Sequence, residues 1–244
     1  MMSASRKKFK APPKRFHPKG LNIIYEDHDI LVVDKISGLL TVSNDKVREQ
    51  TAYFMLNDYV RKGNSKSNRR IFIVHRLDRD TSGLLVFAKN EEAKIYLQEE
   101  WQNFKKKYYA VVCGLPPEPQ GEISSYLAEN SVFRMYSVKD PAKGKFAKTG
   151  YKVLREANKY SLLEVDLYTG RKNQIRVHLA DLGCPVVGDK KYGEKEKGIK
   201  RLALHASSLS IKHPFSKEPM SFETKIPGYF KSLVSQKEER ETSS

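Results

Sequence analysis

Charged and hydroxyl side chains are densest in the stretch His75-Arg76-Leu77-Asp78-Arg79-Asp80-Thr81-Ser82-Gly83. It lies between two short apolar runs, residues 71–74 and 84–88, which favour two β-strands joined by a charged turn. A turn between strands is a place where a rigid scaffold can present reactive side chains. The alternative is a plain charged hairpin turn whose Asp and Thr side chains bond the local backbone. The residues alone leave both interpretations open.

A second dense polar stretch reads Tyr168-Thr169-Gly170-Arg171-Lys172-Asn173-Gln174-Ile175-Arg176-Val177-His178. Its cations could hold phosphates or a carboxylate, and its two amides could hydrogen-bond bases. If residues 174–182 form a short helix, the residues before it lie near the helix N-terminus, which favours anions. The alternative for this stretch is a solvated basic turn.

Outward from these stretches, strand and helix patterns intermix without a regular repeat. Helices are expected over residues 52–60, with Gly63 as C-cap, and after Asn90, a good N-cap residue. Further strands are expected over 21–25, 30–34, 108–112, 150–154, 161–167 and 201–211, with Lys-containing loops over 139–148 and 190–200. Because no βαβ alternation is present, the prediction is an α+β fold with a largely antiparallel sheet.

The charge balance points to a polyanionic partner. Lys and Arg total 45 against 29 Asp and Glu, a net charge of +16, whereas solubility alone requires a magnitude of about 2–8. RNA is the usual partner of so basic a chain, and no basic amphipathic helix supports the rival, a membrane surface. Residues 1–19 hold seven of the cations, no acid and three prolines, which predicts a disordered arm and leaves +9 on the body.

Several other classes are not supported by the sequence. There is no run of about 18 apolar residues for a membrane helix, and no apolar stretch follows the basic N-terminus as in a secretory signal. Cys113 and Cys184 form no CxxC pair, so a reducing cytoplasm is expected. The six histidines lack HxxxH and HExxH spacing, and no GxGxxG or Walker motif is present. Neither a metal nor another cofactor is therefore expected.

The segment from His75 to Asn90, HRLDRDTSGLLVFAKN, resembles the signature of the RluA-like pseudouridine synthase family, in which HRLD precedes TSGLL and a nearby AK. Family-like segments follow in the right order: 25–27 with Lys35, 106–114, 169–178 with 183–192, and 204–206 with 213–214. The resemblance implies a catalytic domain over 21–230, between a basic arm at 1–20 and a flexible tail at 231–244. It implies a mixed, mostly antiparallel central sheet with flanking helices and a catalytic cleft across it.

The resemblance also implies an activity and a set of roles. The activity is the cofactor-free isomerisation of specific uridines in ribosomal RNA of the large subunit or in transfer RNA, by a cytoplasmic monomer. Asp78 is the expected catalytic carboxylate, Tyr108 the pocket aromatic, and Arg176 the cation that keeps Asp78 charged. The residues expected to bind the substrate are Arg76, Thr81, Arg171 and Gln174.

Three departures from the family pattern stand out. Ile36 replaces the usual Pro after Lys35, and Lys172-Asn173 replaces the commoner Thr-His pair. The third is that the extra N-terminal RNA-binding module of many relatives is not expected here. Two rival functions remain at this stage. One is a catalytically inactive RNA- or ribosome-binding protein with the same fold, and the other is a glycosylase that releases free uracil.

Overall fold

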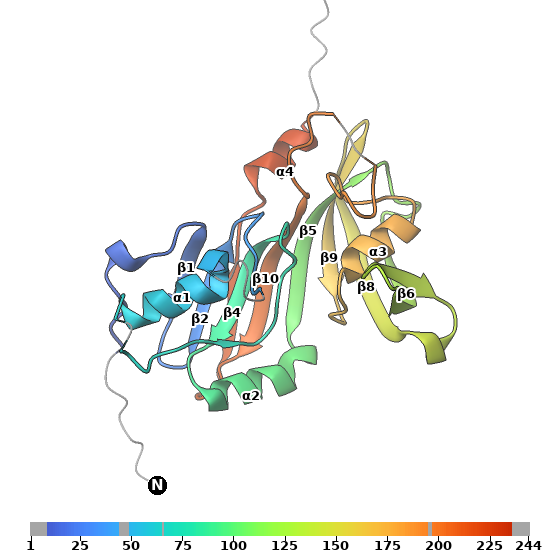
Figure 1. The fold of residues 1–244 in the computed structure, drawn as a ribbon. Coiled ribbons are helices and arrows are strands. Elements are labelled where there is room, and N and C mark those ends of the chain that lie inside the picture. The colour runs from blue at the N-terminus through green and yellow to red at the C-terminus, as the bar shows by residue number, and fades with distance from the viewer. Residues whose placement is uncertain (1–8, 44–48, 65, 195–196, 236–244) are drawn as a thin grey trace, which may run out of the picture. The chain divides into compact units, whose positions relative to one another are not determined.

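The computed structural model describes residues 9–43, 49–64, 66–194 and 197–235, which form two compact units. The first unit comprises the residues up to 103 together with 211–222, and the second comprises 104–210 together with the residues from 223 onward. The described elements, in chain order (Figure 1), are η1 (Lys14–Phe16), β1 (Leu21–Glu26), β2 (Ile30–Lys35), α1 (Ala52–Arg61), β3 (Phe72–Ile73), β4 (Ser82–Ala88), α2 (Glu91–Glu99), η3 (Glu100–Gln102), β5 (Lys105–Cys113), β6 (Gln120–Glu129), β7 (Met135–Val138), η4 (Pro141–Lys143), β8 (Lys145–Glu156), β9 (Tyr160–Leu167), α3 (Gln174–Asp181), β10 (Leu204–Lys212), β11 (Pro219–Glu223) and α4 (Gly228–Leu233). The α+β class is confirmed.

The first unit is built on the strands β2 and β4. β1 pairs with β2, β2 with β4 and β3 with β4, each antiparallel. The apolar runs 30–33 and 84–88 are buried throughout, because a strand covered on both faces needs a continuous apolar run. β1 buries only Leu21 fully, as suits an edge strand. The strands expected over 21–25 and 30–34 are confirmed.

The two helices of the first unit begin at the predicted kinds of residue. The Thr51 side chain accepts a hydrogen bond from the Phe54 N–H at 3.2 Å and starts α1. Asn90 does the same for α2 through the Ala93 N–H at 2.8 Å, which confirms it as an N-cap. The C-cap of α1 is Lys62, in the left-handed region (φ 55°), and not the expected Gly63, which follows at φ 70°.

The second unit is an antiparallel sheet with α3 packed against it. Its strands lie in the order β10-β5-β9-β8-β6-β7. β6 and β7 were not predicted, and the expected loop over 139–148 is wrong for residues 145–148, which belong to β8. Lys, Ser and Glu residues interrupt the apolar positions of β6 and β8 without a regular alternation, so their hydrophobic signal is weak. The short helix expected near 174–182 is confirmed as α3.

Parts of both expected tails make contacts with the fold. The Phe9 ring lies edge-on to His28, with a centroid distance of 5.5 Å, Pro12 is buried, and His17 lies edge-on to Tyr59 at 5.4 Å. Residues 1–8, which include three of the basic residues, lie outside the described residues. At the other end, α4 runs past residue 230, and Val234 is buried. Among the described residues, the helices are too short or too polar to cross a bilayer.

Candidate functional site

The turn that carries Asp78 begins at a fixed histidine. His75 stacks on Trp101 with ring centroids 4.1 Å apart, and its Nε2 accepts the Val86 N–H at 3.1 Å. Because Nε2 is an acceptor, the ring proton of the neutral imidazole belongs on Nδ1. His75 therefore anchors the turn to β4, which begins just after the turn.

The predicted residues of this turn differ in exposure. Asp78 is half-buried, and its carbonyl accepts the Thr81 N–H at 3.2 Å, which closes the turn behind it. Thr81 is buried, whereas Arg76 is exposed and Asp80 is exposed. The turn thus presents Arg76 to solvent and keeps the Asp78 side chain partly shielded.

The segment 35–41 fastens the Asp78 turn from the other side. Thr41 Oγ1 donates to the Leu77 carbonyl at 3.0 Å and accepts the Leu77 N–H at 3.3 Å. The Gly38 N–H donates to the Arg79 carbonyl at 2.9 Å, and Ser37 Oγ donates to the Asp80 carbonyl at 2.6 Å. The backbone on both sides of Asp78 is therefore held by hydrogen bonds from one neighbouring segment.

Lys35 lies in the segment 35–41 that holds the Asp78 turn, and no role was predicted for it from the sequence. Its side chain is fully buried, and its Nζ donates to the carbonyls of Ile36 (3.0 Å), Leu39 (2.8 Å) and Arg79 (3.1 Å). Burial lowers the pKa of Lys35 to about 8, although Asp80, Asp78 and Asp34 act to raise it. A cation buried this deeply is costly unless its hydrogen bonds are satisfied. Here it supplies positive charge close to Asp78.

The Ile36 departure has a structural reason. The Ile36 N–H donates to the Gly20 carbonyl at 3.0 Å, a bond that a proline could not form. A Cβ on Gly20 would lie 2.7 Å from Ile36 Cδ1, so the two residues are in close contact. Ile36 therefore links the residue just before β1 to the segment 35–41.

The turn before α3 carries Arg171 and is held by Gln174. The Gln174 amide oxygen accepts from Thr169 Oγ1 (2.7 Å) and the Arg171 N–H (3.0 Å). Its amide nitrogen donates to the Lys148 carbonyl and to Thr149 Oγ1, both at 2.9 Å. These four bonds use the amide's full capacity in a side chain that is 2% exposed. Gln174, expected to bind substrate, is thus occupied in shaping the turn that presents Arg171.

Arg176, the expected partner of Asp78, has a partner within its own unit that was missed from the sequence. Its Nε donates to Asp189 Oδ2 and its Nη2 to Asp189 Oδ1, both at 2.7 Å. Asp189 is 1% exposed, and its Oδ1 also accepts the N–H groups of Lys191 (2.9 Å) and Tyr192 (3.1 Å). A planar guanidinium bound at two points has a defined orientation. The signal available in the sequence was Gly188-Asp189, in the same family segment as Arg176.

Tyr108 lies on β5 opposite Val165 and Ala206, and it is 9% exposed. The alternation of side chains along β5 places Lys106 on the same face. Lys106 is also buried, and burial lowers its pKa to about 8. This face of β5 therefore combines an aromatic ring with a lysine whose charge is weakly solvated.

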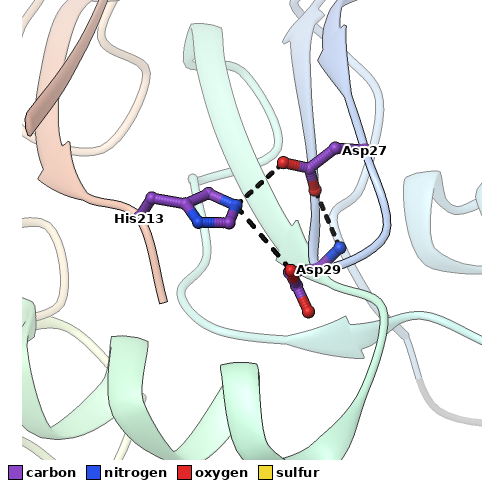
Figure 2. Close-up of side chains that lie close together, drawn as sticks. All are labelled: Asp27, Asp29 and His213. Carbon is purple, nitrogen blue, oxygen red and sulfur yellow. Dashed lines mark hydrogen bonds and ion pairs between the residues drawn. The ribbon is translucent and has the colours of Figure 1, made fainter. Parts of the chain in front are cut away.

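A third polar cluster joins Asp27, Asp29 and His213 in the first unit (Figure 2). His213 Nε2 lies 2.8 Å from Asp27 Oδ2 and 3.9 Å from Asp29 Oδ2. Asp27 also accepts the Tyr25 hydroxyl and the N–H groups of Asp29 and Ile30. Although burial acts to raise it, the Ile30 and Asp29 N–H bonds lower the pKa of Asp27. The Asp27 oxygens are therefore already occupied as hydrogen-bond acceptors. We interpret the cluster as a structural contact that holds residues 211–222 against the turn between β1 and β2.

Two buried histidines of the second unit make its stability depend on pH. His178, fully buried, lies 2.9 Å from Thr149 Oγ1 and 3.0 Å from Ser125 Oγ, and burial lowers its pKa to about 4. Burial also lowers the pKa of His205 to about 4. Between about pH 6.5 and pH 4 the unfolded chain binds more protons than the folded one, so stability falls as the pH falls through this window.

We therefore expect the free energy of unfolding to drop by up to about 1.4 kcal/mol per pH unit for each histidine. Denaturant titrations between about pH 7 and pH 5 measure this slope. His178→Gln keeps a hydrogen-bonding side chain without the titration, so it should remove about half of the slope. An unchanged slope in this variant would show that other groups cause it.

The sequence matches the RNA pseudouridylate synthase family over residues 29–181. The chain belongs to this family. An uncharacterized RNA pseudouridine synthase of Aquifex aeolicus (strain VF5) is 38% identical over 234 residues, covering 90% of this chain and 73% of that protein. Ribosomal large subunit pseudouridine synthase C of Rickettsia bellii (strain RML369-C) is 35% identical over 216 residues, covering 85% of this chain and 69% of that protein.

Among solved structures, human RNA Pseudouridylate Synthase Domain Containing 1 has a TM-score of 0.69 and 29% identity, covering 84% of this chain and 83% of that one. The family resemblance, the fold class and the assignment as an RNA-modifying isomerase are therefore confirmed. The pseudouridine synthase family acts on RNA, which agrees with the net charge of +16.

Proposed function

We propose that this pseudouridine synthase acts on large-subunit ribosomal RNA and uses Asp78 as its reacting carboxylate. The observation that carries the proposal is the locked Asp78 turn, which is fastened on both sides by the segment 35–41 and lies beside the buried ammonium of Lys35. A carboxylate in such a place can stay ionised while partly shielded from water. Large-subunit ribosomal RNA is the first candidate substrate, because the relative from Rickettsia bellii is named ribosomal large subunit pseudouridine synthase C. Transfer RNA is the second candidate.

The reaction breaks the N1–C1′ bond of uridine and forms a C5–C1′ bond. The C5 proton is lost and N1 gains a proton, so the atoms balance without a cofactor. Glycosidases that use two carboxylates need the second to protonate a leaving group or to activate water. Here the detached uracil is the incoming nucleophile, and one ionised carboxylate suffices. Asp78 either attacks C1′ or removes the C2′ proton.

The other proposed roles follow from the chemistry of each side chain. We assign Arg176, oriented by Asp189, to stabilise the charge of Asp78, and Tyr108 to stack on the base and help remove the C5 proton. Arg76 and Arg171 are assigned to bind phosphates of the RNA, and Thr81 is assigned to bind the substrate. The target nucleotide must leave its stack, at a cost of a few kcal/mol that phosphate contacts offset. We place the enzyme in the cytoplasm as a monomer.

The test is to incubate the purified chain with ribosomal RNA and transfer RNA that carry tritium at uridine C5. Formation of pseudouridine releases the tritium to water, and mapping of the product RNA locates the modified uridine. We expect release from the large-subunit RNA. Free uracil in the supernatant would indicate the glycosylase, and neither product from either RNA would indicate the inactive RNA-binding protein.

The basic arm should contribute to RNA affinity through phosphate contacts. Lys10, Lys14, Arg15 and Lys19 are exposed. Replacing all four with Gln should lower the slope of log affinity against log salt by up to about 3, because each lost phosphate contact lowers it by about 0.7–0.9. The measurement is a binding titration at several salt concentrations.

The matched control for the arm replaces four exposed cations of the second unit with Gln: Lys139, Lys152, Arg155 and Lys159. If the control lowers the salt slope as much as the arm variant does, the arm has no special part in binding. The four substitutions in the arm leave the ring contacts of Phe9 and His17 in place, so the variant should keep the fold of the first unit.

A further inference from the structure

The turn between β6 and β7 exposes two apolar side chains at its tip. Val132 is 73% exposed and Phe133 is 70% exposed. A single exposed apolar residue is ordinary on a protein surface. This pair differs from such a residue in the backbone conformation of Phe133 and in the charges around the turn.

Phe133 has a backbone conformation that bulky L-residues rarely adopt, with φ at +58°. The turn is built to hold it there. The Asn130 side-chain oxygen accepts the N–H groups of Val132 (3.1 Å) and Arg134 (2.9 Å), and the Phe133 N–H donates to the Asn130 carbonyl at 3.0 Å. Lys191 Nζ donates to the Phe133 carbonyl at 2.7 Å. An unfavourable conformation that is held by so many bonds points to a function for the side chain that it presents.

Cations lie around the turn that carries the exposed ring. Lys172 Nζ lies 5.7 Å from the Phe133 ring centroid and also contacts the Phe133 carbonyl at 3.5 Å. Lys191 and Arg134 flank the same turn, while the nearby acid Glu129 is paired with Lys172. A flat apolar surface among cations suits a nucleobase attached to phosphates better than it suits an apolar protein surface.

The turn is also tied to the proposed site. The Met135 N–H donates to the Tyr192 hydroxyl at 3.1 Å, and two guanidinium groups lie near the Tyr192 ring, with Arg134 Cζ 5.1 Å and Arg176 Cζ 5.2 Å from its centroid. Tyr192 N–H bonds Asp189, the partner of Arg176. The turn that carries Phe133 is therefore linked through Tyr192 to Asp189, the residue that orients Arg176.

We propose that Phe133 is a stacking platform for an unpaired base of the RNA substrate, held in place by Asn130 and Lys191 and flanked by Lys172. This proposal rests on the proposed function, because it takes RNA as the substrate. The base that stacks on Phe133 would be one near the target uridine, since the turn and Arg176 are joined through Tyr192. Lys172 and Arg134 would contact the phosphates beside that base.

The experiment measures binding by fluorescence anisotropy to a labelled stem–loop RNA and to a fully paired duplex of the same length. Phe133→Leu keeps an apolar side chain but removes the flat ring, so it should weaken binding to the stem–loop by roughly 5- to 100-fold. Binding to the duplex should stay within about 2-fold, because a paired base offers no face for stacking. Phe133→Trp keeps a flat ring, so it should bind the stem–loop as tightly as the unmodified chain does.

The control is the same replacement at another exposed phenylalanine, Phe215→Leu, which lies in the first unit and is 59% exposed. It should bind both RNAs as the unmodified chain does. Equal stem–loop affinity of Phe133→Leu and the unmodified chain would overturn the proposal, as would an equal loss on the duplex. The catalytic assignment is tested separately by tritium release. The binding result for Phe133→Leu therefore does not depend on whether Asp78 is the reacting group.

Discussion

Replacing Asp78 with Asn should reduce pseudouridine formation on the order of a thousandfold or more while leaving RNA binding intact. The amide has nearly the same shape as the carboxylate, but it carries no charge and is neither a nucleophile nor a base. The backbone of the turn is held by Thr41, Gly38 and Ser37, none of which bonds the Asp78 side chain in these contacts. The fold should therefore tolerate the change. Tritium release from C5-labelled RNA measures the activity, and anisotropy measures the binding.

Asp80→Asn is the matched control, since Asp80 is two residues away in the same turn and is exposed. Ser37 bonds the Asp80 carbonyl, which the substitution keeps. We expect activity within a few-fold of the unmodified chain. Full activity of Asp78→Asn together with loss in Asp80→Asn would transfer the catalytic role to Asp80, the residue that composition alone could not distinguish from Asp78.

Much of the fold was predictable because its signals are local. The fully apolar runs at 30–33 and 84–88 predict buried strands, and Asn90 predicts the start of α2 from one side chain. β6 and β7 were missed because polar residues interrupt them and each buries only one side chain, Leu127 and Met135, so no apolar run or regular alternation marks them. The two compact units were not predicted either, since residues 211–222 join the first unit only through contacts distant in sequence, such as His213 with Asp27.

The candidate site divides in the same way. Asp78, Tyr108 and Arg176 could be named from motifs, because each stands in a short segment that resembles the family. The contacts that hold them could not be predicted, although Lys35 and Asp189 also stand in segments that resemble the family. Lys35 bonds Arg79, which is 44 positions away, and Asp189 reaches Arg176 across a loop. Supporting contacts of this kind depend on how distant segments meet, and spacing in the sequence carries little information about that.

Removing the charge of Asp189 should cost the second unit about 3–5 kcal/mol, because the substitution leaves a largely buried guanidinium without its carboxylate. In the structure the Arg176 side chain is 11% exposed and that of Asp189 is 0% exposed. We expect Asp189→Asn to lower the melting temperature by roughly 10 °C, measured by thermal denaturation. Activity should fall further than the unfolded fraction explains, because Arg176 loses its orientation.

Glu129→Gln is the control for this prediction, since it removes the exposed ion pair with Lys172, which should contribute no more than about 1 kcal/mol. The double variant Arg176→Gln with Asp189→Asn pairs two neutral amides and should recover part of the lost stability. It should not recover pseudouridine formation, because no cation then remains at position 176 to stabilise Asp78. A double variant that regains both stability and activity would show that the Arg176–Asp189 pair only holds the fold, and the charge near Asp78 would then have to come from Lys35 alone.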